Sequence, residues 1–297
     1  MSKSVLVIGA NGSIGKAVSS AFLQHGWRVI PFTRRMGDAM VAADVLAAAQ
    51  GVDGGVDVVF HAVNPPQYKN WAGTCLPMLR NSIAAAEAVG ARLAFPGTVY
   101  NFGPDVGEWV DEDAPQNPET RKGAIRVAME TEIEAFTKRG GRALILRAGD
   151  FFGGANSWLK GLVTPGKKVT SLAYPGSPEI GHAWAYLPDL AETFVQLLER
   201  EHRLDAFARF HFEGHWLTGH DLAAALSVPL KRFPWWITKL ASPFVTMFRE
   251  VQEMRYLWDR PLHLDNWRLV AILGSEPRTP LDAALRQSLE DIGCLSA

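Results

Sequence analysis

The stretch "VLVIGANGSIGKAVSSAFLQHG", residues 5–26, decides the fold. An apolar, β-branched run comes first and a helical pattern follows, with Gly9, Gly12 and Gly15 at three-residue spacing between them. Glycine is needed where a chain turns sharply, where backbone approaches a pyrophosphate, and where a helix packs closely on a strand. The helix start then offers N–H groups and the positive end of its dipole to phosphates. The stretch predicts a dinucleotide-binding turn, with nucleotide contacts from Gly9, Asn11, Gly12, Ser13, Ile14 and Gly15.

Strand-like and helix-like segments alternate from this turn to about residue 150. Apolar runs that lack a polar face indicate parallel strands covered by helices on both sides. The fold class expected is α/β, a Rossmann-type doubly wound parallel sheet with a smaller C-terminal substrate lobe. Strands are predicted at 4–10, 27–35, 56–63, 91–97 and 142–149, and helices at 14–25, 42–50, 76–89 and within 122–138.

The character of the chain changes after Gly149. Residues 150–182 are rich in Gly, Pro and Ser, and residues 205–265 hold many aromatic side chains without clear alternation of strand and helix. We therefore expect a dinucleotide-binding domain over 1–150 and a mainly substrate-binding lobe over 151–297. A helix near 186–200 is expected to be able to pack back on the first domain.

The charge balance argues for a small-molecule partner. Net charge is −1 over 297 residues, and basic and acidic side chains are interspersed. A nucleic-acid-binding protein would present a basic face, and none is visible. Small organic substrates are the better expectation.

Cysteine usage and hydropathy bear on location. Cys75 and Cys294 lie far apart, so they predict neither a disulfide framework nor a metal site, and a reducing cytoplasm fits. The N-terminus does not resemble a signal peptide. The segment "FPWWITKLASPFVTMF", 233–248, is too interrupted to cross a bilayer, and a buried or pocket-lining helix is expected there, with no membrane partner.

The end of the second predicted strand bears on the choice of dinucleotide. An acidic residue there would accept from a ribose 2′-hydroxyl, but "PFTRR" supplies Thr33, Arg34 and Arg35. Guanidinium groups suit the 2′-phosphate of NADP, which NAD lacks. The pattern favours NADP(H) over NAD, the alternative being two solvated surface arginines.

Further nucleotide contacts are expected from the next two segments. Asp44 either accepts from the adenine amino group or caps the helix around it. In "VVFHAVNPP", Ala62 and Val63 end a strand and would face the ribose side of the cofactor. His61 in the same run is either a further cofactor contact or a structural histidine.

Several motifs together resemble the extended and atypical branch of the short-chain dehydrogenase/reductase superfamily, whose members are epimerase/dehydratase-like. The resemblance covers nearly the whole chain and says little about substrate. Its implied features include a helix asparagine, Asn81, and a helix-capping aspartate, Asp189. The motifs are "GANGSIG", "MLRNSIAAAEAVGARLAFPGTVYNFG", "LILRAGDFFG", "AYLPDLAETFVQLLE" and "LGSEPRTPLDAALRQSLEDIG".

The chain departs from this branch at the residues that carry catalysis. The family's catalytic serine corresponds to Thr98, whose hydroxyl would bind the reacting oxygen unless it only bonds to backbone. The family tyrosine, about two dozen residues on, corresponds to Lys122, and the lysine four beyond it to Arg126. Arg126 can hold the nicotinamide ribose but cannot donate a proton at neutral pH. Lys122 with a depressed pKa, or Tyr100 in the loop after Thr98, are the replacement donors, the alternative being a proton relayed by substrate or water.

The C-terminal lobe should close over the nicotinamide end, with "RAGDFFGGANSW" as one wall. Each polar or aromatic candidate there could instead have a purely structural role, such as capping a turn or filling a core. The many tryptophans of the lobe either pack its core or line a pocket for an apolar ligand. The substrate-side candidates are Asn81, Asp150, Asn156, His182 and Trp184.

Two functions follow from these residues. The first is an NADP(H)-dependent oxidoreductase or epimerase/dehydratase-like enzyme acting on a small carbonyl or alcohol compound. The second is a redox-silent NADP-binding sensor or scaffold, which the absent tyrosine favours. The segment "FREVQEMRYLWDRPLHLD" would form either a homodimer face or a pocket lid, and the sequence does not separate the two.

Overall fold

A computed structural model of the chain describes residues 2–65, 70–154, 157–242 and 245–294. The expected doubly wound sheet is confirmed. Six strands lie in the order β10-β6-β4-β3-β1-β2, and every neighbouring pair is parallel. Their carboxyl ends therefore share one edge, where α/β sheets bind ligands. The strands are β1 (Ser4–Ile8), β2 (Arg28–Phe32), β3 (Val58–His61), β4 (Arg92–Thr98), β6 (Arg142–Ala148) and β10 (Phe207–His211).

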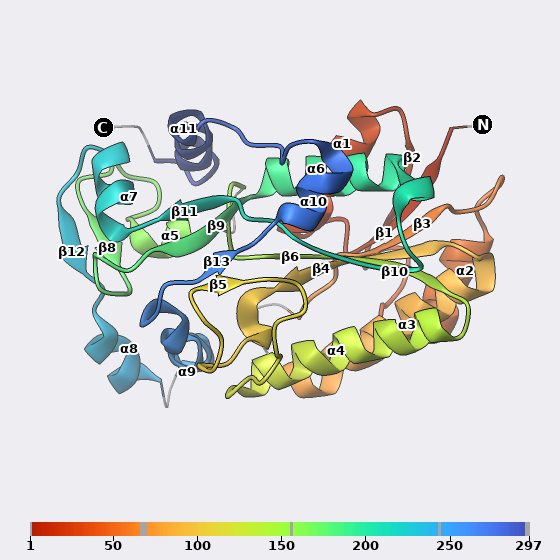
Figure 1. Ribbon diagram of the computed structural model, residues 1–297, viewed down its shortest axis with the longest axis horizontal. Helices are drawn as coiled ribbons and strands as arrows, with labels where there is room; N and C mark the ends of the chain where they lie inside the picture. Colours follow the sequence, from red (N-terminus) through yellow and green to blue (C-terminus); the bar gives the residue numbers. More distant parts are fainter. Residues whose placement is uncertain (1, 66–69, 155–156, 243–244, 295–297) are drawn as a thin grey trace.

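Helices cover both faces of this sheet (Figure 1). Alternate residues of β1 divide between two cores, because successive side chains of a strand point to opposite faces. Val5 and Val7 belong to the core under α1 and α6, whereas Leu6 and Ile8 belong to the core under α2, α3 and α4. One layer holds α2 (Ala42–Gln50), α3 (Trp71–Val89) and α4 (Arg121–Lys138); the other holds α1 (Ser13–Gln24), α6 (Leu187–Glu199) and α10 (Trp267–Leu273).

The C-terminal lobe is built from short elements at the carboxyl edge of the sheet. Its strands pair in the order β11-β9-β7 and as β12-β8, while β13 pairs with β5 from the first half of the chain. The strands are β5 (Trp109–Val110), β7 (Asp150–Phe152), β8 (Leu172–Tyr174), β9 (His182–Tyr186), β11 (His215–Leu217), β12 (Leu230–Arg232) and β13 (His263–Leu264). The helices of the lobe are α5 (Leu159–Leu162), α7 (Gly219–Ala225), α8 (Trp235–Ala241), α9 (Thr246–Glu253), η4 (Arg255–Trp258) and α11 (Leu281–Asp291). Two short helices lie outside it: η2 (Val99–Asn101) follows β4, and η3 (Glu201–Arg203) follows α6.

The two parts of the chain interleave. The core under α2, α3 and α4 continues into the lobe, where it includes Trp258 and Leu285. The sheet also takes β10 from a stretch in which the sequence shows no strand–helix alternation, and α6 packs against the sheet beside α1. A domain boundary at residue 150 stays a prediction, and one drawn there would separate β10 from the sheet that it completes.

Two local expectations differ from the structure. α3 begins at Trp71, a turn earlier than predicted, and carries Pro77 inside it. The expected capping role of Asp189 is wrong, because Asp189 lies within the first turn of α6, after a start that already has a proline in place. Its carboxylate instead accepts from the Thr279 N–H at 2.7 Å and from the Thr279 hydroxyl at 2.6 Å. Asp189 thus ties the segment before α11 to α6.

The segment 233–248 also differs from its expected burial. α8 presents Trp236, Ile237 and Leu240 to solvent, because the lobe buries only the opposite side of this short helix. Among the described residues no helix is long and apolar enough to cross a membrane.

His25 joins the two helices of one layer. The residue follows α1, and its ring nitrogens lie 3.0 Å from a carboxylate oxygen of Glu192 and 3.0 Å from one of Glu199, both on α6. Burial alone would lower the pKa of His25, but hydrogen bonds and charge from Glu199 and Glu192 raise it.

We predict that His25→Ala destabilises the protein more in mild acid than in mild alkali. A raised folded pKa gives stability that is complete below the unfolded value of 6.5 and disappears as pH rises through the folded pKa. The loss in free energy of unfolding should be about 0.5–1 kcal/mol near pH 5.5 and smaller near pH 8.5, measured by urea unfolding. His202→Ala, at an exposed site, is the control. An equal loss at both pH values would contradict the assignment.

Candidate functional site

The glycine loop has the geometry that its spacing predicts. Gly9 has φ +91°, and a Cβ there would lie 2.8 Å from the backbone of Val63. A Cβ on Gly15 would lie 2.2 Å from the Gly9 carbonyl oxygen, and one on Gly12 would lie 3.3 Å from it. α1 therefore packs on β1 at a distance that only glycine permits, and the backbone of the loop is open to a close ligand.

The start of α1 suits an anion. Gly12 is the N-cap residue and provides no side-chain cap, and the first turn carries no acidic residue. Asn11 is exposed, and Ser13 and Ile14 are half-buried, so the first N–H groups of the helix lie at an accessible surface. A pyrophosphate would satisfy these donors and meet the positive end of the helix dipole.

The loop after β2 holds the two arginines in the open. Arg34 and Arg35 are exposed, and the turn that contains them is closed by the Met36 N–H donating to the Thr33 carbonyl at 2.8 Å. No described residue forms an ion pair with either arginine. An approaching phosphate would therefore meet two uncommitted guanidinium groups.

Two residues brace this loop from outside. The Asp44 carboxylate accepts from the Asp38 N–H at 2.8 Å, and the Asn81 side-chain amide donates to the Ala39 carbonyl at 2.8 Å. Asp44 thus holds the loop as well as lying in the first turn of α2. Asn81, predicted on the substrate side, contacts the loop that carries the arginines.

His61 ends β3 as a buried, neutral side chain. The Ser82 hydroxyl donates to the Met78 carbonyl, so it accepts from His61 Nδ1–H at 2.8 Å. Burial and the nearby Arg126 charge lower the pKa of His61 to about 3. The residue is therefore uncharged at neutral pH, and Ala62 and Val63 after it supply backbone beside Gly9.

Arg126 lies under the carboxyl edge of β4. Its guanidinium donates to the Pro96 carbonyl at 3.5 Å and lies 5.1 Å from the Trp71 ring and 5.5 Å from the Phe95 ring. Aromatic faces and a carbonyl stabilise a cation there. The guanidinium keeps its positive charge at neutral pH.

Lys122, one turn before Arg126, faces the lobe instead. Its side chain is only 2% exposed, and its ammonium bonds to Glu250 and, at 2.6 Å, to Glu253. Burial alone would raise the pKa of Glu253, but hydrogen bonds and charge from Lys122, with charge from Arg121, hold it below its usual range. Lys122 therefore joins α4 to α9, and we call these contacts the α4–α9 latch.

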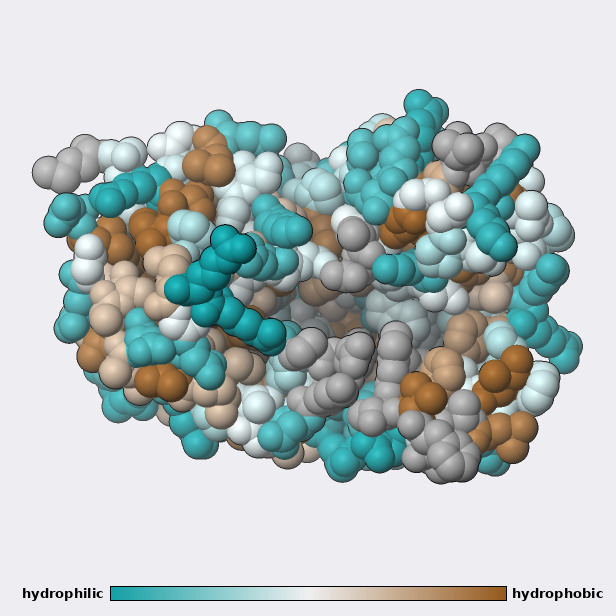
Figure 2. Space-filling view, turned by 180° about the vertical axis from the view of Figure 1, so that it is seen from behind, coloured by the Kyte–Doolittle hydropathy of each residue, from teal (hydrophilic) through white to brown (hydrophobic). Residues whose placement is uncertain are grey.

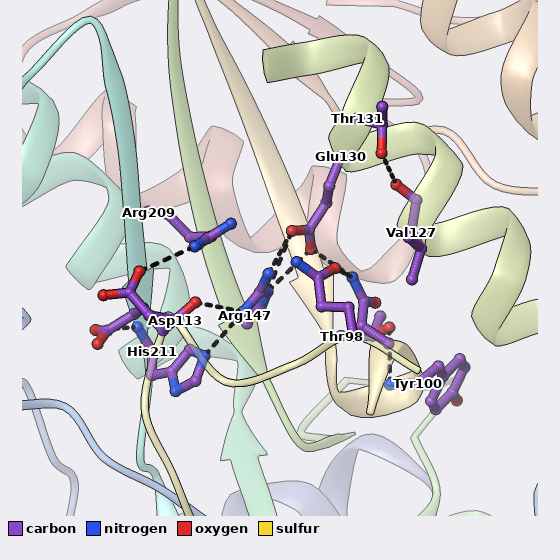
Figure 3. Close-up of polar contacts among 12 residues, drawn as sticks. Thr98, Tyr100, Asp113, Val127, Glu130, Thr131, Arg147, Arg209 and His211 are labelled. Carbon is purple, nitrogen blue, oxygen red and sulfur yellow. Dashed lines mark hydrogen bonds and ion pairs between the residues drawn. The ribbon is translucent and has the colours of Figure 1, made fainter. Parts of the chain in front are cut away.

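Thr98 and Tyr100 occupy the loop between β4 and α4. The Thr98 hydroxyl accepts from the Tyr100 N–H at 3.3 Å and caps η2, and the Tyr100 side chain is buried (Figure 3). Sequence reasoning missed Tyr256 as a neighbour of this loop, because its segment gave only an amphipathic pattern. Its hydroxyl lies 3.5 Å from the Tyr100 carbonyl, and burial raises the pKa of Tyr256 to about 12.

A buried ion pair behind this loop was also missed. Arg147 on β6 bonds to Glu130 on α4 with a shortest distance of 2.6 Å, and the Asn101 amide donates to Glu130 at 2.9 Å (Figure 3). Arg147 also contacts the His211 ring, and burial with the Arg147 charge lowers the pKa of His211 to about 3. Glu130 follows Lys122 and Arg126 at four-residue spacing, which was the available signal.

The lobe brings three predicted substrate-side residues together. His182 Nε2 lies 2.8 Å from an Asp150 carboxylate oxygen, and the His182 ring lies edge-on to Trp184, with ring centres 5.7 Å apart. The same ring stacks on Trp258 at 4.1 Å, a partner that sequence reasoning did not single out. All of these side chains are buried. Asn156 lies outside the described residues.

The surface is hollowed between the sheet and the lobe (Figure 2). Asp150 follows β6 directly, so the His182–Asp150 pair lies where the sheet passes into the lobe. The glycine loop, Arg126 and Thr98 lie at the carboxyl ends of β1, β4 and their neighbours on the other side. The hollow therefore has the glycine loop, Arg126 and Thr98 on its sheet side and the His182–Asp150 pair on its lobe side.

Comparison with known proteins agrees with this geometry. Residues 5–208 match the NAD dependent epimerase/dehydratase family. The chain belongs to this family. No curated protein matches the chain in sequence.

Solved structures share the fold across the whole chain. The UDP-glucose 4-epimerase of Thermotoga maritima has a TM-score of 0.74 at 16% identity, over 97% of this chain and 98% of that one. The dTDP-4-dehydrorhamnose reductase of Clostridium acetobutylicum has 0.71 at 16% identity over the same shares. The UDP-glucose 4-epimerase of Bifidobacterium longum, determined with NAD⁺ and UDP, has 0.72 at 13% identity, again over 97% and 98%. At such identities the likeness shows the fold alone.

The α4–α9 latch predicts a large effect of removing one cation. Lys122→Met leaves the buried Glu250 and the half-buried Glu253 short of a partner, and should lower the free energy of unfolding by about 3–5 kcal/mol. Lys138→Met on the same helix removes a lysine that is 72% exposed and should cost at most about 0.5 kcal/mol. Urea unfolding of both variants measures the difference. Similar small losses for the two would contradict a buried, paired Lys122.

Proposed function

We propose that this chain is an NADP(H)-dependent enzyme, an oxidoreductase or an epimerase/dehydratase-like enzyme, for a small carbonyl or alcohol compound. The observation that carries the proposal is the open start of α1 together with two exposed arginines and no acid at the end of β2. Membership of a nicotinamide-dependent family supports the first part, and the arginines support NADP over NAD.

The residues present fit this cofactor. Gly9, Gly12 and the N–H groups of Ser13 and Ile14 would hold the pyrophosphate, and Arg34 with Arg35 would pair with the 2′-phosphate. Thr33, Asp44, Ala62 and Val63 would border the adenosine and ribose. NADP(H), when bound, supplies a hydride donor or acceptor.

Arg126 would serve the ring end of the cofactor. Its charge is permanent, so it can hold ribose hydroxyl groups and stabilise negative charge on a substrate oxygen. After burial, the same charge is the second cause of the low pKa of His61, so His61 adds no positive charge beside Arg126 at neutral pH. Arg126 is a positioning and electrostatic residue in this proposal and moves no proton.

The proton would come from Tyr100 in preference to Lys122. The α4–α9 latch already neutralises the Lys122 ammonium with two carboxylates, so its release would leave buried charges unpaired. Thr98 would bind the reacting oxygen beside Tyr100. Asp150, His182 and Trp184 would border the substrate on the lobe side, and the chain has no tyrosine followed four residues later by lysine.

The α4–α9 latch also favours a second candidate, a redox-silent NADP-binding sensor. α9 covers the position where the family tyrosine would stand, which suits a protein that binds nucleotide without turnover.

For both candidate functions a cytoplasmic location is proposed, since Cys75 and Cys294 are free thiols. A homodimer stays an expectation.

NADPH should stabilise the protein against heat more than NADH does. Arg34→Ala with Arg35→Ala should weaken NADPH binding by about tenfold or more and leave NADH binding unchanged, because only NADPH carries the 2′-phosphate. Arg286→Ala, at an exposed arginine on α11, is the matched control. Equal stabilisation by both nucleotides in the unaltered protein would exclude the NADP preference.

Tyr100→Phe should reduce NADPH oxidation with carbonyl substrates by about 100-fold or more while NADPH binding persists. Lys122→Arg should keep activity, because arginine preserves the ion pairs but cannot donate a proton at neutral pH. Tyr174→Phe is the control, since its hydroxyl donates to the Ile180 carbonyl. If Lys122→Arg alone loses activity, the proton donor is Lys122 and not Tyr100. NADPH binding without turnover of any substrate would support the sensor.

A further inference from the structure

α8 has one buried side and one open side. Trp235 faces inward, and its indole N–H donates to the Pro175 carbonyl at 2.6 Å. Thr238, one turn on, is buried and accepts from the Gln252 amide at 2.6 Å. Trp236 and Leu240 point the other way and are 67% and 69% exposed, with Ile237 beside them at 43%. Their spacing places these three apolar side chains on one face of the helix.

Over residues 230–258, the stretch that contains α8, the exposed charged side chains are all basic, and the exposed acid Asp259 follows this stretch. Between residues 230 and 258 the only acids are Glu250 and Glu253, and both are drawn inward by Lys122 in the α4–α9 latch. The basic side chains of the same stretch are all exposed. They are Lys231, Arg232, Lys239, Arg249 and Arg255.

Hydrophobic residues also gather over this tip of the lobe in the space-filling view, away from the central hollow (Figure 2). In the ribbon, α8 lies at the outer end of the lobe, and α9 lies between it and α4 (Figure 1). The face is therefore separate from the nucleotide-binding side. The apolar residues do not contribute to the cofactor or substrate contacts described above.

We propose that α8 docks the protein on an anionic lipid surface. Trp236, Ile237 and Leu240 would enter the boundary between headgroups and acyl chains, where the amphipathic indole is favoured. The exposed lysines and arginines would attract acidic headgroups and keep their charges in water. No helix of the described chain spans a membrane, so the contact is peripheral.

The exposed basic side chains near α8 favour an anionic lipid surface over a second copy of the chain. An apolar patch that pairs with a second copy of the same chain would bring two sets of like charges together, which opposes association. A bilayer that contains acidic lipid complements both parts of the surface, because its acyl chains accept the apolar side chains and its headgroups attract the cationic ones. Binding should fall as salt rises, because the charged contribution is exposed and screened.

Co-sedimentation with vesicles tests the proposal. The full chain should bind vesicles of phosphatidylcholine with phosphatidylglycerol and bind phosphatidylcholine alone much more weakly. Trp236→Ala with Leu240→Ala should reduce binding by about tenfold or more, because the apolar contact is lost. Lys239→Glu should also weaken binding, and more so at low salt.

Trp267→Ala removes a tryptophan on α10 that is 57% exposed, and should leave vesicle binding unchanged. The melting temperature without nucleotide should be the same in all variants, which shows that they are folded and keeps this test separate from the proposed function. Absence of binding, equal binding to both vesicle types, or equal losses in the control would overturn the proposal. A self-association of the unaltered chain, lost in Trp236→Ala with Leu240→Ala without lipid, would assign the face to a second copy instead.

Discussion

The buried ion pair between Arg147 and Glu130 is the constraint on which the site depends. The Arg147 side chain is 0% exposed and that of Glu130 4%, so both charges are removed from water at a cost that only good partners can offset. Asn101 supplies a further hydrogen bond to Glu130, and the Glu112 carbonyl accepts from Arg147. The pair thereby fixes α4 against β6 and holds the loop that contains Thr98 and Tyr100. Loss of one partner would leave an isolated charge buried between α4 and β6, which would weaken the contact that positions α4 at the site.

Along α4 the side chains at successive turns face three different environments. Glu130 lies in the core of the sheet, Arg126 under the carboxyl edge of β4, and Lys122 against α9 of the lobe. One helix therefore contributes to the core, places the Arg126 charge at the carboxyl edge of the sheet and joins the lobe through α9. Lys122, at the position where the family resemblance predicts a tyrosine, joins α4 to α9 of the lobe. In the proposed enzyme the proton would then come from the loop before α4 or through a relay by substrate or water, and in a protein without redox chemistry the α4–α9 latch would still join the lobe to α4.

How much the sequence predicts depends on how far apart the interacting residues lie. Gly9, Gly12 and Gly15 act within one turn, so their spacing is enough to give the strand, the helix and the close approach between them. Lys122 finds its partners at Glu250 and Glu253, and Asp189 finds Thr279, across separations that no local pattern encodes. β10 escaped prediction for the same reason, since five residues become a strand only when β6 lies beside them. The open face of α8 was read as buried because hydropathy records composition and not which side of a short helix the lobe covers.

A crystal structure of the protein grown with NADPH would test the central claim most directly. The nucleotide should lie along the carboxyl edge of the sheet, with its pyrophosphate on the N–H groups of Ser13 and Ile14 and its 2′-phosphate within hydrogen-bonding distance of Arg34 or Arg35. The nicotinamide ribose should face Arg126, with Tyr100 and Thr98 on the substrate side. A nucleotide bound elsewhere, or a 2′-phosphate turned away from both arginines, would contradict the assignment.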